Sequence, residues 1–272
     1  MNKLNISVLG LTLSAATAAT YSTSFDSFSS GNVSGQDNWV AQTQWQADGS
    51  GNISNSNGAF VRAHNTSVLG TTAIGETSTF VTTFALTAFT APSNDIASFE
   101  QGILQQGLSH QQGSAAFAYG IASGLFYNPS NGNLVLRSNQ GTFVSGTNST
   151  TVGLASGLGL SAWEMTSIYT KTAAGTYSVQ TSLDNTGDAN PAFTISYTAS
   201  VSADLDTDSD GGGLIGGIQA LPSSGGSGGV ATPPFGSTTI SSYSFDVTAV
   251  PEPSSALLLS FAGLGLLSRR SR

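Results

Sequence analysis

Residues 163–185 have the sequence WEMTSIYTKTAAGTYSVQTSLDN, and this stretch decides the fold class. Tyr177, Val179, Thr181 and Leu183 alternate with small or polar residues, which is the period of a strand with one buried face. The segment 163–169 is richer in apolar residues, as expected of a central strand in a sandwich. Two strands therefore follow one another here.

The same alternation recurs along most of the chain. Residues 193–198 and 243–248 place aromatic and β-branched side chains at every second position, and no long helical periodicity precedes residue 250. Further strands, richer in apolar residues, are predicted over 80–89, 115–126 and 134–136. Turn-forming residues separate the predicted strands at 128–133, 185–188 and 223–229. Ten or more short strands at this spacing predict an all-β antiparallel β-sandwich or jelly roll.

Two local patterns resemble a known fold family. The first is Phe25-Asp26-Ser27-Phe28 followed by Gly31, Gly35-Gln36 and Trp39, and the second is the stretch 163–184. Both are similar to exported jelly-roll domains of the concanavalin A-like and laminin-G-like type. The resemblance implies a sandwich of the lectin and glucanase kind, whose last strand returns beside a first strand near residues 24–28. Sugar binders, hydrolases and structural domains share that fold, so it does not choose a function.

The N-terminus has the pattern of a secretory signal peptide over residues 1–19. Lys3 supplies a positive charge, an apolar stretch follows, and Ala16 and Ala18 satisfy the small-x-small rule for signal peptidase. We expect a signal helix that is removed near Ala19. Residues 20–249 are then the single mature β-sandwich domain.

The C-terminal segment 250–272 resembles the PEP-CTERM sorting signal of exopolysaccharide-producing Gram-negative bacteria. Pro251, Glu252 and Pro253 precede an apolar helix predicted over 254–267, and a basic end over 268–272 contains Arg269 and Arg270. The resemblance implies cutting by an exosortase-type membrane protease. The apolar helix has a length of about 21 Å against a hydrocarbon core of about 30 Å, which predicts transient insertion and not permanent anchoring.

Charge and cysteine content narrow the possible partners. Between residues 20 and 249 stand 14 acidic residues and three basic ones (Arg62, Arg137 and Lys171), a net charge of −11. Such a domain excludes nucleic acid as a partner and leaves neutral glycans and divalent cations. The chain has no cysteine, so a β core of ordinary size must stabilise it.

An acidic, glycine-rich segment is the candidate metal site. Asp206, Asp208, Asp210 and Gly211 match positions one, three, five and six of a calcium loop, but position twelve is Gly217 where a bidentate Glu is expected. Calcium is therefore the candidate cofactor, and a solvated acidic loop without metal is the alternative.

Candidate catalytic and sugar-stacking residues are few. Glu76, Glu100 and Glu164 are isolated in sequence and are interpreted as solvent-facing strand residues, whereas glucanases of this fold need paired acids. His64 and His110 have no ligand or nucleophile context, so we assign no catalytic residue. Trp45, between Gln44 and Gln46, is the candidate for stacking on a sugar ring, with burial in the core as the alternative.

Three functions remain open at this stage. The sequence predicts a non-catalytic protein of the outer surface or extracellular matrix of a Gram-negative-type bacterium, with exopolysaccharide as its candidate ligand. Signal peptidase and an exosortase-type enzyme are the expected processing partners. The alternatives are a glycan hydrolase whose carboxylates meet only in three dimensions and a purely structural surface protein.

Overall fold

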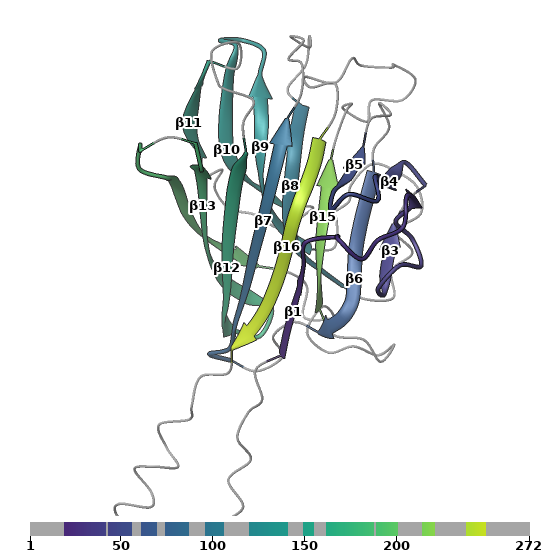
Figure 1. The fold of residues 1–272 in the computed structure, drawn as a ribbon. Helices are drawn as coiled ribbons and strands as arrows, with labels where there is room; N and C mark the ends of the chain where they lie inside the picture. The colour runs from purple at the N-terminus through teal and green to yellow at the C-terminus, as the bar shows by residue number, and fades with distance from the viewer. Residues whose placement is uncertain are drawn as a thin grey trace, which may run out of the picture.

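The computed structural model describes residues 19–41, 43–55, 61–69, 74–86, 96–105, 120–140, 149–154, 162–187, 189–200, 214–220 and 238–248. These residues form two antiparallel sheets packed face to face and contain no helix (Figure 1). The predicted all-β antiparallel sandwich is thus confirmed. The strands are β1 (Ala19–Thr23), β2 (Gly31–Asn32), β3 (Trp39–Ala41), β4 (Trp45–Ala47), β5 (Ile53–Asn55), β6 (Val61–Leu69), β7 (Thr77–Leu86), β8 (Ile96–Gln105), β9 (Gly120–Asn128), β10 (Asn133–Gln140), β11 (Ser149–Leu154), β12 (Trp163–Ala173), β13 (Thr176–Asn185), β14 (Phe193–Ser200), β15 (Leu214–Ala220) and β16 (Thr238–Thr248).

The stretch 163–185 forms the hairpin of β12 and β13. Trp163 pairs with Asn185 and Lys171 with Tyr177, and Gly175 adopts a φ of 62° in the connecting turn. Every second residue is buried from Trp163 to Lys171 in β12 and from Tyr177 to Leu183 in β13, as the alternation predicts. The remaining positions point to the opposite face of the sheet because successive side chains of a strand alternate.

The nine-stranded sheet has the order β14-β13-β12-β7-β16-β5-β4-β2. β16 lies in the middle of this sheet and pairs with β7 on one side. On its other side, residues 243–247 of β16 pair with β1 and residues 238–240 pair with β5. The last strand does return beside the first, but it pairs with residues 19–23 and not with 24–28. The reason is local: Phe25 has a φ of 60°, which turns the chain out of the extended conformation.

The seven-stranded sheet has the order β11-β10-β9-β8-β15-β6-β3. A tight turn at the predicted position connects β9 and β10. The Asn128 side-chain oxygen accepts a bond from the Ser130 amide, and Gly132, with a φ of 73°, donates its amide to the Asn128 carbonyl. Asparagine and glycine are the residues that such a turn favours.

The core between the sheets is mainly aromatic. Phe84 stacks on Phe99 with ring centroids 4.3 Å apart, and Trp39 meets Tyr243 edge-on at 5.1 Å, so both pairs join one sheet to the other. Gly216 of β15 leaves space for the Phe80 and Tyr243 side chains of the other sheet. A Cβ at this position would lie 2.2 Å from the Phe80 ring and 2.3 Å from the Tyr243 hydroxyl.

A buried polar network lies beside this aromatic core. Gln101 of β8 donates to the Met165 carbonyl and to the Ser167 hydroxyl, at 3.0 and 2.9 Å, and the Thr181 hydroxyl lies 3.1 Å from Ser167. The side chains of Gln101, Ser167 and Thr181 have no exposed surface. The hydrogen bonds of the Gln101 amide nitrogen and of the two hydroxyls are made within the protein, which allows their burial, whereas the Gln101 side-chain oxygen has no partner among the described residues.

Candidate functional site

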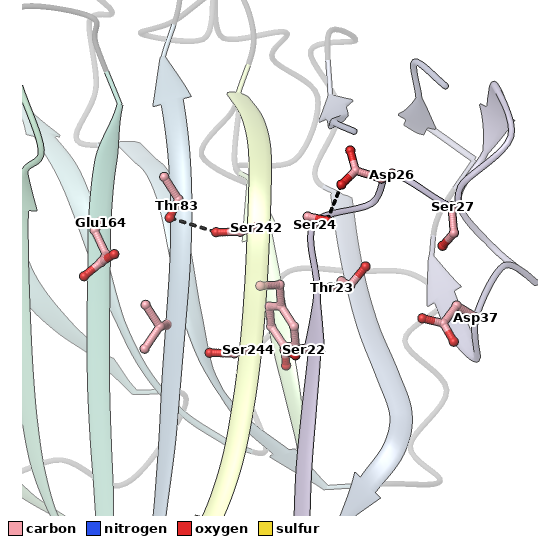
Figure 2. A pocket seen from close by; sticks show the side chains of 12 residues that line it. Ser22, Thr23, Ser24, Asp26, Ser27, Asp37, Thr83, Glu164, Ser242 and Ser244 are labelled. Carbon is pink, nitrogen blue, oxygen red and sulfur yellow. Dashed lines mark hydrogen bonds between the residues drawn. The ribbon is translucent and has the colours of Figure 1, made fainter. Parts of the chain in front are cut away.

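A trough of about 590 Å³ lies on the outer face of the nine-stranded sheet, beside β1 (Figure 2). Seven Ser and Thr side chains, one Tyr and three carboxylates line it, and none of the described residues that line it is Lys, Arg or His. We call this pocket the trough and define it by its lining residues: Ser22, Thr23, Ser24, Asp26, Ser27, Asp37, Val81, Thr83, Glu164, Ser242, Tyr243 and Ser244.

The floor of the trough consists of outward-facing residues of three neighbouring strands. Ser242 of β16 pairs with Thr83 of β7, which pairs in turn with Glu164 of β12. The Ser242 hydroxyl donates to the Thr83 hydroxyl at 2.8 Å. A register shift between Ile240 and Ser242 is what turns Ser242 toward this face.

One wall is the turn that follows β1. The Phe25 side chain is fully buried, packs edge-on against Phe28 at 5.2 Å, and anchors the turn from below. The amide of Phe25 donates to the Thr23 hydroxyl, and the Ser24 hydroxyl donates to Asp26 at 2.5 Å. A positive φ at a bulky residue such as Phe25 is rare and costs free energy. This strained anchor places Ser24 and Asp26 at the rim.

The Asp37–Asn38 turn forms a second wall, beside the turn after β1 and on the side of the trough away from Glu164 (Figure 2). Asp37 and Asn38 have φ angles of 45° and 61°, a left-handed conformation that Asp and Asn tolerate better than most residues. β6 holds this turn: the buried Asn65 side chain donates to the Asp37 carbonyl at 2.8 Å, and the Thr66 amide donates to the Asn38 carbonyl. The backbone of the second wall is therefore fixed by a neighbouring strand.

The carboxylate of Asp37 is oriented by a chain of hydrogen bonds. The Tyr21 hydroxyl donates to Asp37 at 2.7 Å and accepts a bond from the Trp39 indole at 2.9 Å. Burial, with the neighbouring Asp37 as a second cause, raises the pKa of Tyr21 well above its ordinary value. The phenol therefore stays protonated and remains a donor to Asp37 at neutral pH.

The trough offers hydrogen-bond acceptors and donors without a basic group. Each hydroxyl can donate one bond and accept two, and an ionised carboxylate accepts only. In the part of the chain that the structure describes, no three His, Asp or Glu side chains gather as a metal site. The arrangement therefore suits a ligand that is neutral and rich in hydroxyl groups.

Trp45, predicted as a sugar-stacking residue, is not part of this site. It lies in β4 with 0% of its surface exposed and belongs to the hydrophobic core. The hypothesis of a stacking platform at Trp45 is therefore wrong, and the alternative, burial in the core, holds. The polar neighbours Gln44 and Gln46 face outward because side chains alternate along a strand.

The glutamates do not come together. Glu164 lines the trough on the outer face of the nine-stranded sheet. Glu100 is fully buried, so its interpretation as a solvent-facing residue is wrong. Its side chain occupies the space beside Gly124, where a Cβ would lie 2.5 Å from the Glu100 Cγ. Its neighbour Gln101 points into the core, so Glu100 lies on the far face of the other sheet. Both sheets separate Glu100 from Glu164.

The remaining predicted site residues lie outside the described part of the chain. These are the candidate calcium ligands Asp206, Asp208 and Asp210, and the sorting residues Pro251, Glu252, Pro253, Arg269 and Arg270. Within the described residues, no helix is long and apolar enough to span a membrane.

Sequence analysis missed Asp37 as a site residue and used Asp26 only as part of a fold pattern. The Asp37-Asn38 dipeptide was the available signal, because Asp and Asn favour left-handed turns. Nothing in the sequence indicates that β6 and Tyr21 would hold that turn beside the end of β1.

Comparison with solved structures shows a lectin fold. The chain is similar to peanut lectin with a nine-residue peptide (16% identity, 87% of this chain and 100% of that one, TM-score 0.52). It is also similar to winged bean acidic lectin complexed with methyl-α-D-galactose (11%, 86% and 100%, 0.55) and to lectin I of Ulex europaeus with the methyl glycoside of α-L-fucose (11%, 85% and 98%, 0.53). The predicted concanavalin A-like jelly roll is confirmed. Neither the family models nor the curated proteins that were searched gave a match to the sequence.

Proposed function

We propose that this lectin-fold chain is an exported surface protein that binds a neutral glycan in the trough and does not cleave it. The observation that carries the proposal is the described lining of the trough, which combines seven Ser and Thr hydroxyls and three carboxylates with no basic side chain. Carboxylates accept strong hydrogen bonds from sugar hydroxyls, and Ser and Thr both donate and accept. An anionic glycan would be repelled by Asp26, Asp37 and Glu164.

The separation of the glutamates supports binding without hydrolysis. Glycoside hydrolysis needs two carboxyl groups held about 5 to 9.5 Å apart across the scissile bond. Glu100 and Glu164 have two sheets between them, and at the trough Asp26 and Asp37 already accept hydrogen bonds from Ser24 and Tyr21. Binding needs only shape and hydrogen bonds, and the trough supplies both.

The solved lectins support the class of ligand. Two of the structures with this fold contain a methyl glycoside, of galactose and of fucose respectively. At 11% identity these two structures indicate the fold, and the lining of the trough indicates the class of ligand.

Export and sorting follow from the chain ends. The pattern of residues 1–19 and the order of Pro251-Glu252-Pro253, apolar segment and arginines support secretion and processing by an exosortase-type enzyme. The proposed location is the outer surface or extracellular matrix of a Gram-negative-type bacterium, with exopolysaccharide as the natural ligand.

Retention on polysaccharide tests the proposal. The purified protein is passed over immobilised neutral polysaccharide from the host, and both retention and release of reducing ends are measured. We expect retention without release, and a loss of affinity of about tenfold in Asp37→Asn and in Glu164→Gln, the equivalent of one or two hydrogen bonds.

Glu76→Gln is the matched control, because Glu76 does not line the trough; its affinity should be unchanged. Reducing ends that appear with the wild type and disappear in Glu164→Gln would establish a hydrolase instead. A wild type that is neither retained nor active would leave the purely structural function.

A further inference from the structure

The outer face of the nine-stranded sheet carries rows of hydroxyl groups beyond the trough. One row runs across five strands through residues that pair directly with one another: Thr248, Thr77, Thr170, Ser178 and Thr198. Every member has a hydroxyl side chain. The Thr77 and Thr170 hydroxyls lie 3.1 Å apart, so the row is in register at the level of side chains as well as backbone.

A second row connects this face to the trough. It begins with Ser22, Ser244 and Val81, which line the trough, and continues through Thr166 and Ser182 to Thr194 on β14. Hydroxyl side chains of this row therefore continue beyond the trough over β12, β13 and β14. We call these two rows together the hydroxyl platform.

The members of both rows are accessible. A third row lies between them and contains Asp246, Thr79, Ile168, Gln180 and Ser196, so a chain that starts at the trough follows the second row. The platform's members on β7 and β12 are half-exposed, and Ser178, Thr194 and Thr198 are exposed. No member of either row carries a charge. Each hydroxyl has more hydrogen-bonding capacity than a single neighbour can use, which favours a partner that presents many hydroxyls of its own.

We propose that the hydroxyl platform binds one extended neutral polysaccharide chain, which lies across the strands from the trough to β14. The inference rests on the proposed function and specifies its ligand as a polymer. Strands in a sheet lie about 4.8 Å apart, so six of them span about 24 Å, which is longer than a disaccharide.

Sheet twist restricts the form of the polymer. Adjacent strands rotate by about 20 to 25° relative to each other, so rows across five or six strands follow a curved surface. A single flexible chain can follow such a surface, whereas the flat face of a crystalline polymer touches only part of it. The platform is therefore suited to a soluble chain.

Paired ligands of different length test the inference. Binding of the purified protein to cellobiose and hydroxyethylcellulose, maltose and soluble starch, and mannobiose and mannan is measured by affinity electrophoresis and calorimetry. For the pair that binds, we expect the Thr194→Lys/Ser182→Lys variant, in the row that adjoins the trough, to bind the polymer about tenfold more weakly and the disaccharide with unchanged affinity. Lysine on the outward-facing positions of an edge strand and its neighbour is compatible with the fold.

Two controls separate the hydroxyls from other effects. Thr194→Ser/Ser182→Thr keeps both hydroxyls and should bind the polymer like the wild type. Ser130→Lys adds a charge at an exposed turn of the other sheet and should also bind normally. Asp37→Asn, in the trough, should weaken binding of disaccharide and polymer alike.

The outcomes distinguish the two proposals. If polymer and disaccharide bind equally tightly and the double lysine variant has no effect, the platform is overturned while the trough stands. If no sugar binds, the proposed function itself fails. If the wild type sediments as a dimer that the lysines dissociate, with polymer binding unchanged, the platform is an interface between copies of the chain and the inference is wrong.

Discussion

The hydroxyl of Thr181, on β13, donates a hydrogen bond of 2.6 Å to the hydroxyl of Ser123, on β9 of the opposite sheet. Ser123 in turn lies 3.0 Å from the Tyr197 hydroxyl, which donates to the Ala122 carbonyl. Both serine and threonine are fully buried. The two sheets are thus joined by directional bonds as well as by apolar packing, and such bonds fix one relative position of the sheets.

Replacing Thr181 with Val should lower the free energy of unfolding by about 1 to 3 kcal/mol, because buried partners lose their bonds. Thr181→Ser keeps the hydroxyl and is the matched control, with a smaller loss from the missing methyl group. Urea denaturation measures both. An unchanged free energy of unfolding in Thr181→Val would contradict the prediction, because that variant keeps the methyl group and loses only the hydroxyl.

Alkaline pH should destabilise the protein. Burial raises the pKa of Tyr169, Tyr197 and Tyr243 well above the ordinary value near 10. The unfolded chain then releases these protons near pH 10 while the folded chain retains them, so stability is full below pH 10 and falls as the pH rises above it. Melting temperatures between pH 8 and pH 11 check this, together with phenolate absorbance, to which Tyr169, Tyr197 and Tyr243 should contribute only on unfolding. Phenolate formation by all tyrosines near pH 10 without unfolding would contradict it.

Trp45 variants should affect stability and not binding. Trp45→Ala removes a fully buried side chain and should cost about 3 to 5 kcal/mol. The Trp45 indole nitrogen has no hydrogen-bond partner within the protein, so Trp45→Phe should cost less. Thermal melts give the ranking, and glycan affinity measured where both variants are folded should equal that of the wild type. A selective loss of affinity in Trp45→Phe would restore the stacking hypothesis.

Calcium should stabilise the protein if Asp206, Asp208 and Asp210 bind it. At about 100 times its dissociation constant the ion adds about 2.7 kcal/mol to the native state. Melting is compared in millimolar calcium, in millimolar magnesium and in chelator, for the wild type and for Asp206→Asn/Asp208→Asn. Superimposable curves for the wild type would favour the solvated acidic loop.

Sorting predicts a shorter mature protein. Mass spectrometry of protein released from the host surface should find a chain that begins near Ala19 and lacks residues 257–267. A Pro251→Ala/Pro253→Ala variant should retain the tail, since the sequence recognised by the protease is changed. Intact Arg272 in surface-released wild type would contradict processing.

The fold was predictable because alternation in the sequence and burial in the structure coincide. β13, β14 and β16 bury the residues that their period of two selects, and the turn at 128–133 has the chemistry that its sequence predicts. Each of these signals is local, and a strand with one buried face needs no more than a local signal.

The site was less predictable because its residues meet through contacts distant in sequence. Asn65 fixes the Asp37 backbone across 28 positions, and Ser242 meets Thr83 across 159. The burial of Trp45 and Glu100 also depends on neighbours from other strands, such as Gly124 above Glu100. Single-sequence periodicity carries none of this information.

The pairing of β16 has a mechanical consequence. β16 forms the last described strand and lies alongside β7 from Thr238 to Thr248. A pull between the C-terminal end of β16 and a polymer bound to the same sheet would act along the β16–β7 ladder. All hydrogen bonds of the ladder would then resist the pull at the same time. β1 pairs with residues 243–247 on the other edge of β16, so its ladder would be loaded in the same direction. A pull on the residues that follow β16 would therefore be borne by two ladders at once, because the end of this strand is held on both edges.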